Sequence, residues 1–531
     1  MNANLRRPWC ALTMAVCLAA SIHTGAAADD LDAAKAQARA LLERIAAQER
    51  ELAALKAEQA ALLERLEKKA PTAGEPQQPA PAQVAAPPPG KAERNWLADH
   101  VRLGGYGSVR FEAGGAPGAA RGFTFRRFVL TTDATPAPRI RMHTETEFER
   151  LFGLEAEKTA TATAGGLQLK QALEGNNGGE IAIEQAWGQY DFAGGHGLRA
   201  GVVLVPLGRF NILHDDDYWD LPRRTLVDRD ASVTPVKTAW RELGAGLVGG
   251  FQVGPAKLDY QFYVLNGATL DFNLESVAQT RDPRRNKLAL EGEFALTSGA
   301  FDGSQGARAI AWRAAFSPAL AGEFALSGYH GRYTPSYLSA GEPVNSLAFD
   351  YQWRRGPLAL EGEAVYTSFG RVRRVIDAFA ATAFRSAAET STPEARQLES
   401  EIEFELGGLA RTRYGFWTDI KYYWRPRWLK RTFLGRPFDD PVLIPILRYE
   451  RVWLNRRLEE LAFANGAVTA LETADFEQDR VSLGLSYRPL RSFGLQLALE
   501  RNRRLNGAQL IFPRVDARTA AGLVGGLVFS F

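Results

Sequence analysis

The sequence predicts an all-β transmembrane barrel of about sixteen antiparallel strands, preceded by an α-helical coiled coil. From about residue 103 onward, polar and apolar side chains alternate with a period of two, in segments long enough to cross a bilayer at a tilt. The chain also ends on an apolar strand that closes with Phe531. Such a strand suits a closed barrel in lipid and would promote aggregation at an open edge. The alternative is a buried last strand of a soluble β domain.

The first 28 residues predict export. Two arginines precede an apolar run and then three alanines, which is the pattern of a secretory signal peptide cleaved near Asp29. Both cysteines, Cys10 and Cys17, lie inside this segment, so we expect no disulfide and no thiolate metal site in the mature chain. No later apolar run reaches the roughly 18 residues of a membrane-spanning helix, whereas a closed barrel can still span.

Three further segments follow the signal peptide. Residues 29–69 repeat apolar side chains at heptad spacing, which predicts a periplasmic coiled coil that joins several copies of the chain. A solitary, solvated helix is the alternative. Residues 70–100 are rich in Pro and Ala and predict an extended linker. Residues 101–531 form the predicted barrel domain.

Composition limits the classes of function. The chain has 531 residues and a formal net charge of +3, although 24% of its residues are charged. A nucleic-acid-binding protein would carry one sign of charge over a whole face, so the balance of charges argues against this class. A soluble chain of this length would form about three domains, whereas one large barrel uses the same length as a single domain.

The segment 139–149 shows the alternation best, because its ionisable side chains all fall on one face. Such a face needs water or opposite charges, and the lumen of a barrel offers both. Catalysis by His143 is the alternative, but no nucleophile or orienting partner is indicated beside it. We therefore predict no catalytic residue and expect these side chains to face the lumen: Arg110, Arg139, Arg141, His143, Glu145 and Glu147.

The predicted connections alternate in length. Short turns fall on one rim, and long connections fall mainly on the opposite rim, as in outer-membrane barrels. Two more strand-like segments, 287–296 and 399–406, are assigned to hairpins within long extracellular loops. If both crossed the membrane, the barrel would have about eighteen strands.

Several short motifs occur in order between residues 103 and 531: Gly104–Phe111, Phe123–Phe128, Leu198–Gly201, Pro206–Phe210, Leu265–Gly267, Arg448–Arg451 and Leu485–Pro489. Together they resemble the phosphate-selective porin O/P family of Gram-negative outer membranes. The resemblance implies a trimeric barrel whose third long loop folds inward, with basic residues that guide anions. The lysine-rich pore ladder of the phosphate-specific members has no counterpart here, because arginine carries the positive charge and is mixed with acids.

The third long connection, residues 207–238, carries both signs of charge. Opposed acids and bases across a narrow passage screen solutes by charge and dipole, so this loop is the predicted constriction. The alternative is an ordinary solvated loop tied by weak ion pairs. Three adjacent aspartates lack the spacing of a calcium loop, so no metal site is predicted. The predicted constriction residues are Arg209, Asp215, Asp216, Asp217, Arg223, Arg224, Arg229 and Lys237.

Taken together, these observations predict a porin of the Gram-negative outer membrane. We expect a water-filled channel for passive diffusion of small hydrophilic solutes, with anions such as phosphate preferred, and no cofactor. The expected partners are outer-membrane lipid, two further copies of the chain in a homotrimer, and the cell wall. Two alternatives stay open: a barrel enzyme of lipase or protease type, and a structural tether between the outer membrane and the cell wall.

Overall fold

A computed structural model describes residues 96–531 apart from 151–153, 164–165, 176–179, 231–232, 283–284, 300–308, 320–321, 339, 391–398, 407–408, 465–466 and 508–509. The predicted signal peptide, the coiled coil and most of the linker therefore lie outside the described residues. No helix among the described residues is both long and apolar enough to cross a bilayer.

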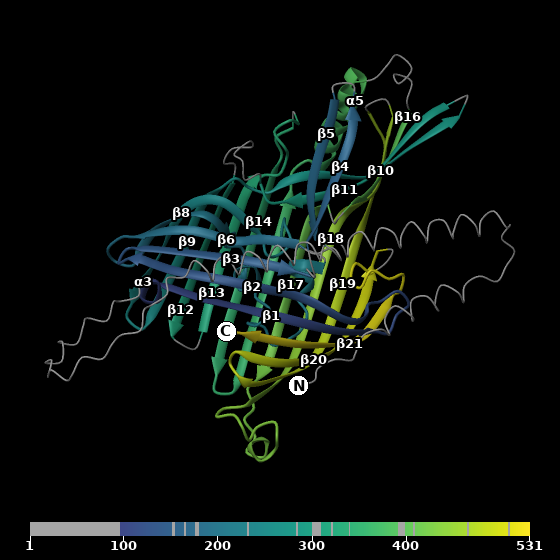
Figure 1. The fold of residues 1–531 in the computed structure, drawn as a ribbon. Helices are drawn as coiled ribbons and strands as arrows, with labels where there is room; N and C mark the ends of the chain where they lie inside the picture. Colours follow the sequence, from purple (N-terminus) through teal and green to yellow (C-terminus); the bar gives the residue numbers. More distant parts are fainter. Residues whose placement is uncertain are drawn as a thin grey trace, which may run out of the picture. The chain divides into compact units, whose positions relative to one another are not determined.

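The chain folds into a closed barrel of sixteen strands, and the predicted barrel is confirmed. Each strand pairs with its neighbours in antiparallel register, and β1 closes the ring against β21 (Figure 1), where Tyr106 lies opposite Ser530. The first eight barrel strands are β1 (Val101–Gly114), β2 (Arg121–Ala137), β3 (Ile140–Glu149), β6 (Glu180–Asp191), β7 (His196–Leu204), β8 (Arg241–Val253), β9 (Ala256–Leu265) and β12 (Ala309–Ala319). The other eight are β13 (Gly322–Arg332), β14 (Pro343–Arg355), β15 (Leu358–Phe369), β17 (Ala410–Tyr422), β18 (Val442–Ala464), β19 (Ala467–Leu490), β20 (Phe493–Asn506) and β21 (Thr519–Ser530).

Five strands pair outside the ring. β4 (Leu154–Thr163) pairs with β5 (Gly166–Gly175), and β10 (Thr269–Asp282), β11 (Arg285–Thr297) and β16 (Glu399–Leu406) form a separate sheet. The two strand-like segments assigned to loop hairpins belong to β11 and β16, which explains why they leave the strand number at sixteen. The described helical elements are α3 (Trp96–His100), α4 (Arg209–Ile212), the π-helical turn η2 (Leu226–Asp230), α5 (Val372–Thr390) and η4 (Leu429–Arg431).

The alternation along each strand separates two environments. In β20, Leu495, Leu497 and Leu499 point outward and are 40%, 49% and 59% exposed, while Gln496 and Glu500 between them point inward and are buried. Large apolar side chains are exposed on most other barrel strands as well. Apolar surface of this extent is rare on soluble monomers and is typical of a barrel whose outer face meets hydrocarbon.

One long connection lies on the rim that otherwise carries the short turns. The turns β2–β3, β6–β7, β8–β9, β14–β15 and β19–β20 are short and lie on one rim, as expected. Residues 423–441 between β17 and β18 also lie on this rim, because Tyr422 pairs with Leu358 just after a short turn. This long segment on the short-turn rim contains η4.

Candidate functional site

Residues 205–240, between β7 and β8, fold into the barrel; we call this segment the inner loop. The side chain of Asn211 joins the two ends of this loop. Asn211 donates to the carbonyls of Val205 and Trp240 at 2.7 and 3.0 Å and accepts from the backbone N–H of Trp240 at 2.7 Å. These bonds satisfy buried backbone groups where the chain leaves the sheet, so the loop starts and ends at one point of the wall.

Aromatic packing holds the middle of the inner loop. The rings of Phe210 and Trp219 stack with centroids 4.4 Å apart, and Trp417 of β17 meets Trp219 edge to face at 5.4 Å. Trp219 is 3% exposed and Trp417 is 1% exposed, so this contact is a small apolar core inside the barrel. The loop is therefore a packed element rather than a solvated excursion.

On one side the inner loop rests on strands β17 to β20, whose inward charges form complementary pairs. Arg448 donates to Asp419 at 2.6 and 2.8 Å, and Arg480 donates to Glu450 at 2.7 Å. The loop adds its own charges to this array: Asp220 accepts from Lys421 at 2.9 Å and from Arg488 at 2.7 Å, and Arg223 donates to Glu500 at 2.7 Å. We call this surface the paired wall.

The paired wall also binds the loop backbone. Glu450 accepts from the N–H of Leu226 at 2.6 Å, and Arg448 donates to the carbonyl of Arg223 at 3.1 Å. Charged groups that bind backbone atoms this way stabilise one loop conformation, because buried peptide groups must find partners.

On the opposite side the loop meets Glu145 and Glu147 of β3 and Glu184 of β6, which we call the acid-rich wall. Each of these carboxylates is at most 6% exposed. His214 of the loop lies 2.9 Å from Glu184, and Arg127 of β2 lies 2.9 Å from Glu147. Glu145 has only a more distant base, since His143 Nε2 lies 4.0 Å from it.

The loop carboxylate Asp216 lies beside this wall and is held as an anion. It accepts from Ser108 at 2.6 Å and lies 3.4 and 3.6 Å from Arg127 and Arg224. Burial alone would raise the pKa of Asp216, but the guanidinium groups of Arg127 and Arg224 hold it well below its usual range. Burial would likewise lower the pKa of His214, yet the nearby carboxylates, led by Glu184, raise it to about 9.

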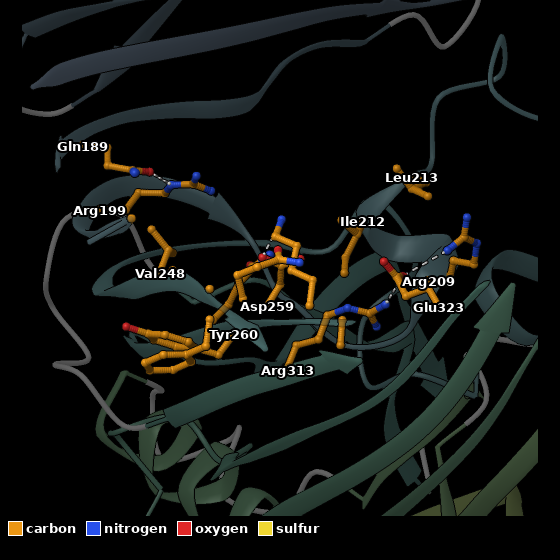
Figure 2. Close-up of a pocket in the computed structure, with 18 of the residues that line it drawn as sticks. Gln189, Arg199, Arg209, Ile212, Leu213, Val248, Asp259, Tyr260, Arg313 and Glu323 are labelled. Atoms are coloured by element: carbon orange, nitrogen blue, oxygen red, sulfur yellow. Dashed lines mark hydrogen bonds and ion pairs between the residues drawn. The ribbon is translucent and has the colours of Figure 1, made fainter. Parts of the chain in front are cut away.

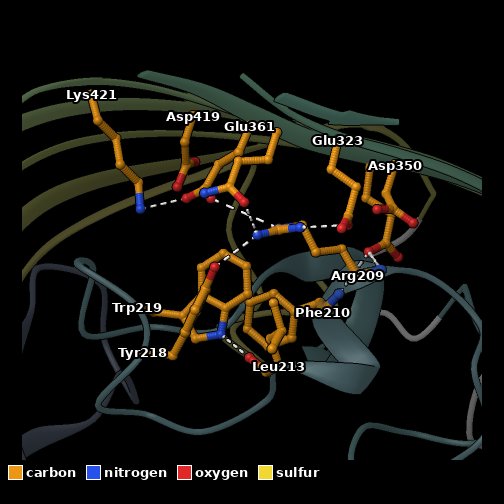
Figure 3. Close-up of polar contacts among 12 residues, drawn as sticks. Arg209, Phe210, Leu213, Tyr218, Trp219, Glu323, Asp350, Glu361, Asp419 and Lys421 are labelled. Carbon is orange, nitrogen blue, oxygen red and sulfur yellow. Dashed lines mark hydrogen bonds and ion pairs between the residues drawn. The ribbon is translucent and has the colours of Figure 1, made fainter. Parts of the chain in front are cut away.

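Arg209 at the start of α4 reaches across to a third group of strands (Figure 3). Its guanidinium donates to Tyr218 of the loop at 2.7 Å and to Glu323 of β13 at 3.3 Å. The backbone N–H groups of Arg209 and Phe210 both donate to Glu363 of β15, at 2.7 and 2.9 Å. The helix start is therefore fixed to the wall by a carboxylate, and the arginine is only 4% exposed.

A cavity of about 700 Å³ lies on the short-turn side of the inner loop (Figure 2). Its lining reaches from Gly195 in a short turn to Leu213 of the loop. Basic residues outnumber acidic ones in this lining: the bases are Arg141, Arg199, Arg209, Lys257 and Arg313, and the acids are Asp259 and Glu323. We call it the lower vestibule.

A second cavity, of about 440 Å³, lies towards the opposite rim and is lined by residues near the ends of β1 and β20 and the start of β21. We call it the upper vestibule. Its charged lining residues are Glu112, Arg223, Lys237, Glu500 and Arg514. Arg223 and Lys237 belong to the inner loop, so the same loop that borders the lower vestibule also borders the upper one.

The structure places most of the predicted constriction residues within the inner loop and against the barrel wall. Arg209, Asp216 and Arg223 make the contacts described above, while Asp217 contributes its carbonyl to a bond from Arg488 at 2.9 Å. Arg224 joins two parts of the loop by donating to the carbonyls of His214 and Thr238. Lys237 is exposed, and the side chain of Asp215 is 39% exposed. Arg229 lies in η2, and its side chain is outside the described part.

The predicted lumen residues divide into two groups. Arg110, Glu145 and Glu147 are buried inside the barrel, where Arg110 donates to the loop carbonyl of Pro222 at 2.9 Å. Arg141 and His143 lie near the short-turn end of β3 and pair with Asp191 and Asp133. Arg139 was expected on the strand, but it lies in the turn before β3, which begins at Ile140, because Pro138 and Arg139 form the reversal of the chain.

Sequence reasoning missed most of the wall residues that receive the loop. The missed residues with direct contacts to it include Arg127, Glu184, Glu363, Lys421, Arg448, Glu450, Arg480 and Arg488. A signal was present, since Arg448-x-Glu450 repeats the alternation of charges that marked β3. Which of these charges meet the loop depends on pairing between distant strands.

The chain has limited similarity to known proteins. No family model matches the chain. An uncharacterized protein of Aquifex aeolicus is 25% identical over 167 residues, and the match spans about a third of each chain (32%). Among solved structures, the anion-selective porin of Comamonas acidovorans aligns with a TM-score of 0.44 and 11% identity over 81% of this chain and 99% of its own. OmpF of Salmonella typhi in complex with daunomycin (TM-score 0.42, 8%) and the channel DcaP of Acinetobacter baumannii (TM-score 0.40, 10%) each align over 81% of this chain and 97% of their own.

Proposed function

We propose that this protein is a porin of the Gram-negative outer membrane that lets small hydrophilic solutes diffuse down their gradients. The observation that carries the proposal is the charged inner loop, which borders a vestibule with charged lining residues on each side within a closed barrel. The exposed apolar side chains of the outer face support insertion in lipid. A loop that narrows a wet lumen screens solutes by size and by charge.

Anions are the preferred solutes in this proposal. The lower vestibule offers the guanidinium groups of Arg199, Arg209 and Arg313 and the ammonium group of Lys257. Arg199 lies over the ring of Trp187 at 3.9 Å and donates to Gln189 at 2.9 Å. These two contacts hold its guanidinium group beside the cavity. Fixed guanidinium groups suit phosphate and carboxylate groups, so phosphate is the solute we test first.

The assembly is proposed from the sequence pattern. The heptads of residues 29–69 support a homotrimer whose coiled coil lies in the periplasm and contacts the cell wall. Passive conduction needs no catalytic group, and we propose that the protein is not an enzyme. A lipase or protease would lose its activity on a single Ser, His or Asp substitution and would show little ion conductance. A structural tether would show neither catalytic activity nor ion conductance.

Planar-bilayer conductance of the purified full-length protein tests the proposal. A trimeric porin gives stable channels that close in three equal steps, and a KCl gradient gives a reversal potential of the sign of anion selectivity. In the variant Arg199→Gln the anion preference falls. Arg354→Gln serves as the matched control, because Arg354 lies over Tyr423 near the same rim and is not among the lining residues of the vestibule. Absence of stepwise channels from correctly folded protein contradicts the porin, and cation selectivity contradicts the anion preference alone.

A further inference from the structure

A cluster of possible metal ligands lies where the inner loop meets the acid-rich wall. Glu145 of β3, Glu184 of β6 and the loop residues His214 and Asp215 each offer one ligand atom, and these atoms all lie within 4.8 Å of one another. The Nε2 atom of His214 is 2.9 Å from Glu184 and 3.7 Å from Asp215 Oδ1. Three separate segments of the chain thus bring one imidazole and three carboxylates to a single point.

The surrounding contacts orient these groups as they do in metal sites. The Nδ1 atom of His214 is 3.2 Å from the carbonyl of Asn211, so Nδ1–H donates to it and Nε2 faces the carboxylates. Gln185 donates to Glu145 Oε2 at 2.7 Å and accepts from Trp187 at 3.2 Å, which fixes the plane of that carboxylate. Metal-binding histidines and carboxylates characteristically hold such outer partners.

Two oxygen atoms of the cluster lack a hydrogen-bond donor. Among the described residues, Glu145 Oε1 and Asp215 Oδ1 are buried atoms without a hydrogen-bond partner, and the whole Glu145 side chain is only 2% exposed. A buried carboxylate oxygen without a donor costs free energy, and a bound cation would remove that cost.

The nearby bases are engaged elsewhere. Arg127 lies 2.9 Å from Glu147 and 3.4 Å from Asp216, neither of which belongs to the cluster. Within the part of the chain that the structure describes, His214 faces the three carboxylates and His143 Nε2 lies 4.0 Å from Glu145, so the cluster carries net negative charge even when both imidazoles are protonated. A divalent cation supplies the missing positive charge.

From this geometry we propose that the cluster binds a divalent first-row transition metal such as Zn²⁺ and thereby fixes the inner loop to the barrel wall. One imidazole nitrogen with three carboxylate oxygens suits zinc or manganese, whereas calcium takes six to eight oxygen ligands. Imidazole coordinates in its neutral form, so metal binding at Nε2 releases the His214 proton to solvent. Zinc bonds of about 2 Å require ligand atoms roughly 3 to 4 Å apart, which small side-chain rotations achieve here. Asp215, whose side chain is 39% exposed, is the member through which a cation reaches the cluster.

Titration calorimetry on the untagged full-length protein, stripped of metal with a chelator and dialysed, tests the site. We expect ZnCl₂ to bind with one high-affinity site per chain and CaCl₂ to bind much more weakly. His214→Gln and Glu184→Gln remove ligands and abolish this binding, and Gln185→Ala lowers the affinity by about 10- to 100-fold, as loss of an outer partner does. His330→Gln is the matched control, since His330 pairs with Asn345 away from the cluster and its loss leaves zinc affinity unchanged.

A second measurement keeps the test valid if a ligand variant misfolds. Zinc X-ray absorption on the wild-type protein should show one nitrogen and oxygen ligands without sulfur, and zinc should slow hydrogen exchange in residues 205–240. Glu145→Gln, which keeps the shape of the side chain, should bind zinc less tightly while the barrel stays folded. The proposal is overturned if the folded wild-type protein binds no zinc, if His214→Gln binds it equally well, or if zinc leaves the exchange of the loop unchanged. None of these results depends on conductance, so they leave the porin proposal to its own test.

Discussion

The two walls that receive the inner loop differ in how their charges are balanced. On the paired wall, each inward acid has a base of its own, as Asp419 has Arg448 and Glu450 has Arg480. On the acid-rich wall, Glu184 lies 2.9 Å from His214, Glu145 has His143 only at 4.0 Å, and two buried oxygens of the described cluster lack donors. Both walls hold the same loop inside the same barrel. We expect the paired charges to hold the fold together and the less balanced charges to be available to a cation.

The balance on the paired wall has a physical reason. A buried ion pair is weak evidence for stability, because desolvation offsets most of its attraction, but removal of one partner leaves an uncompensated buried charge. Glu450 and Arg448 of the paired wall also form hydrogen bonds with backbone atoms of the loop, so these pairs hold the loop in one conformation. The acid-rich wall is less fully compensated, because Glu145 has no close base, and we expect it to be the more sensitive to added cations.

The largest expected effect comes from breaking the paired wall with Glu450→Gln. This change removes the carboxylate that accepts from the fully buried Arg480 and weakens the bond to the N–H of Leu226. We expect a loss of about 3 to 5 kcal/mol in the free energy of unfolding. Urea unfolding of the protein in lipid vesicles measures it, and a loss below about 1 kcal/mol would show that the pair is not a determinant of stability.

The sequence predicts local features of the barrel, but it does not predict contacts between residues that are far apart in the chain. The barrel and its sixteen strands follow from the period of two, because side-chain alternation is a local property of each strand. The inner loop was indicated by its mixed charges. Its partners could not be predicted, because Glu145, Glu184 and His214 meet only after β3 pairs with β6 and the loop folds back onto both.

The rejection of a metal site at Asp215–Asp217 shows the same limit. Local spacing excludes a calcium loop formed by adjacent aspartates, and that argument considers only neighbours in the chain. Asp215 instead meets carboxylates from two barrel strands, and Asp216 meets Ser108 and two arginines. Adjacent residues of one loop thus have different electrostatic surroundings.

A second, smaller effect concerns pH at Asp228 in η2, on the paired side of the loop. Burial raises the pKa of Asp228 to about 7, although a hydrogen bond with Thr225 opposes the rise. The charged groups around it are Glu450, Arg224 and Arg448, and Glu363 is a further acidic neighbour. The fold prefers the neutral acid, so its stabilising contribution is complete below the unfolded value of 3.8 and is lost as the pH rises towards 7.

Hydrogen exchange of residues 205–240 measures this pH dependence after correction for intrinsic rates. Between about pH 4 and pH 7, the opening free energy of the wild-type loop should fall by up to about 1.4 kcal/mol per pH unit through this group. Asp228→Asn keeps the shape and removes the titration, so the curve of the variant should be flatter over this interval. Equal slopes in the two proteins would mean that Asp228 stays ionised when buried. Thr225→Val serves as a second variant in this experiment, because it removes the hydrogen bond to Asp228 without changing the number of charges.

The smallest effect is expected where the two walls differ most, from Glu145→Gln in metal-free protein. The substitution is chemically the same as Glu450→Gln, but Glu145 loses no base of comparable proximity, since His143 Nε2 lies 4.0 Å away and the donor Gln185 can still bind an amide oxygen. We expect a change in the unfolding free energy of about 1 kcal/mol or less, because relief of carboxylate repulsion offsets a weakened hydrogen bond. The same urea unfolding experiment compares the two variants directly. A loss as large as that of Glu450→Gln would show that the acid-rich wall is balanced by charges within the protein, and the physical distinction between the two walls would disappear.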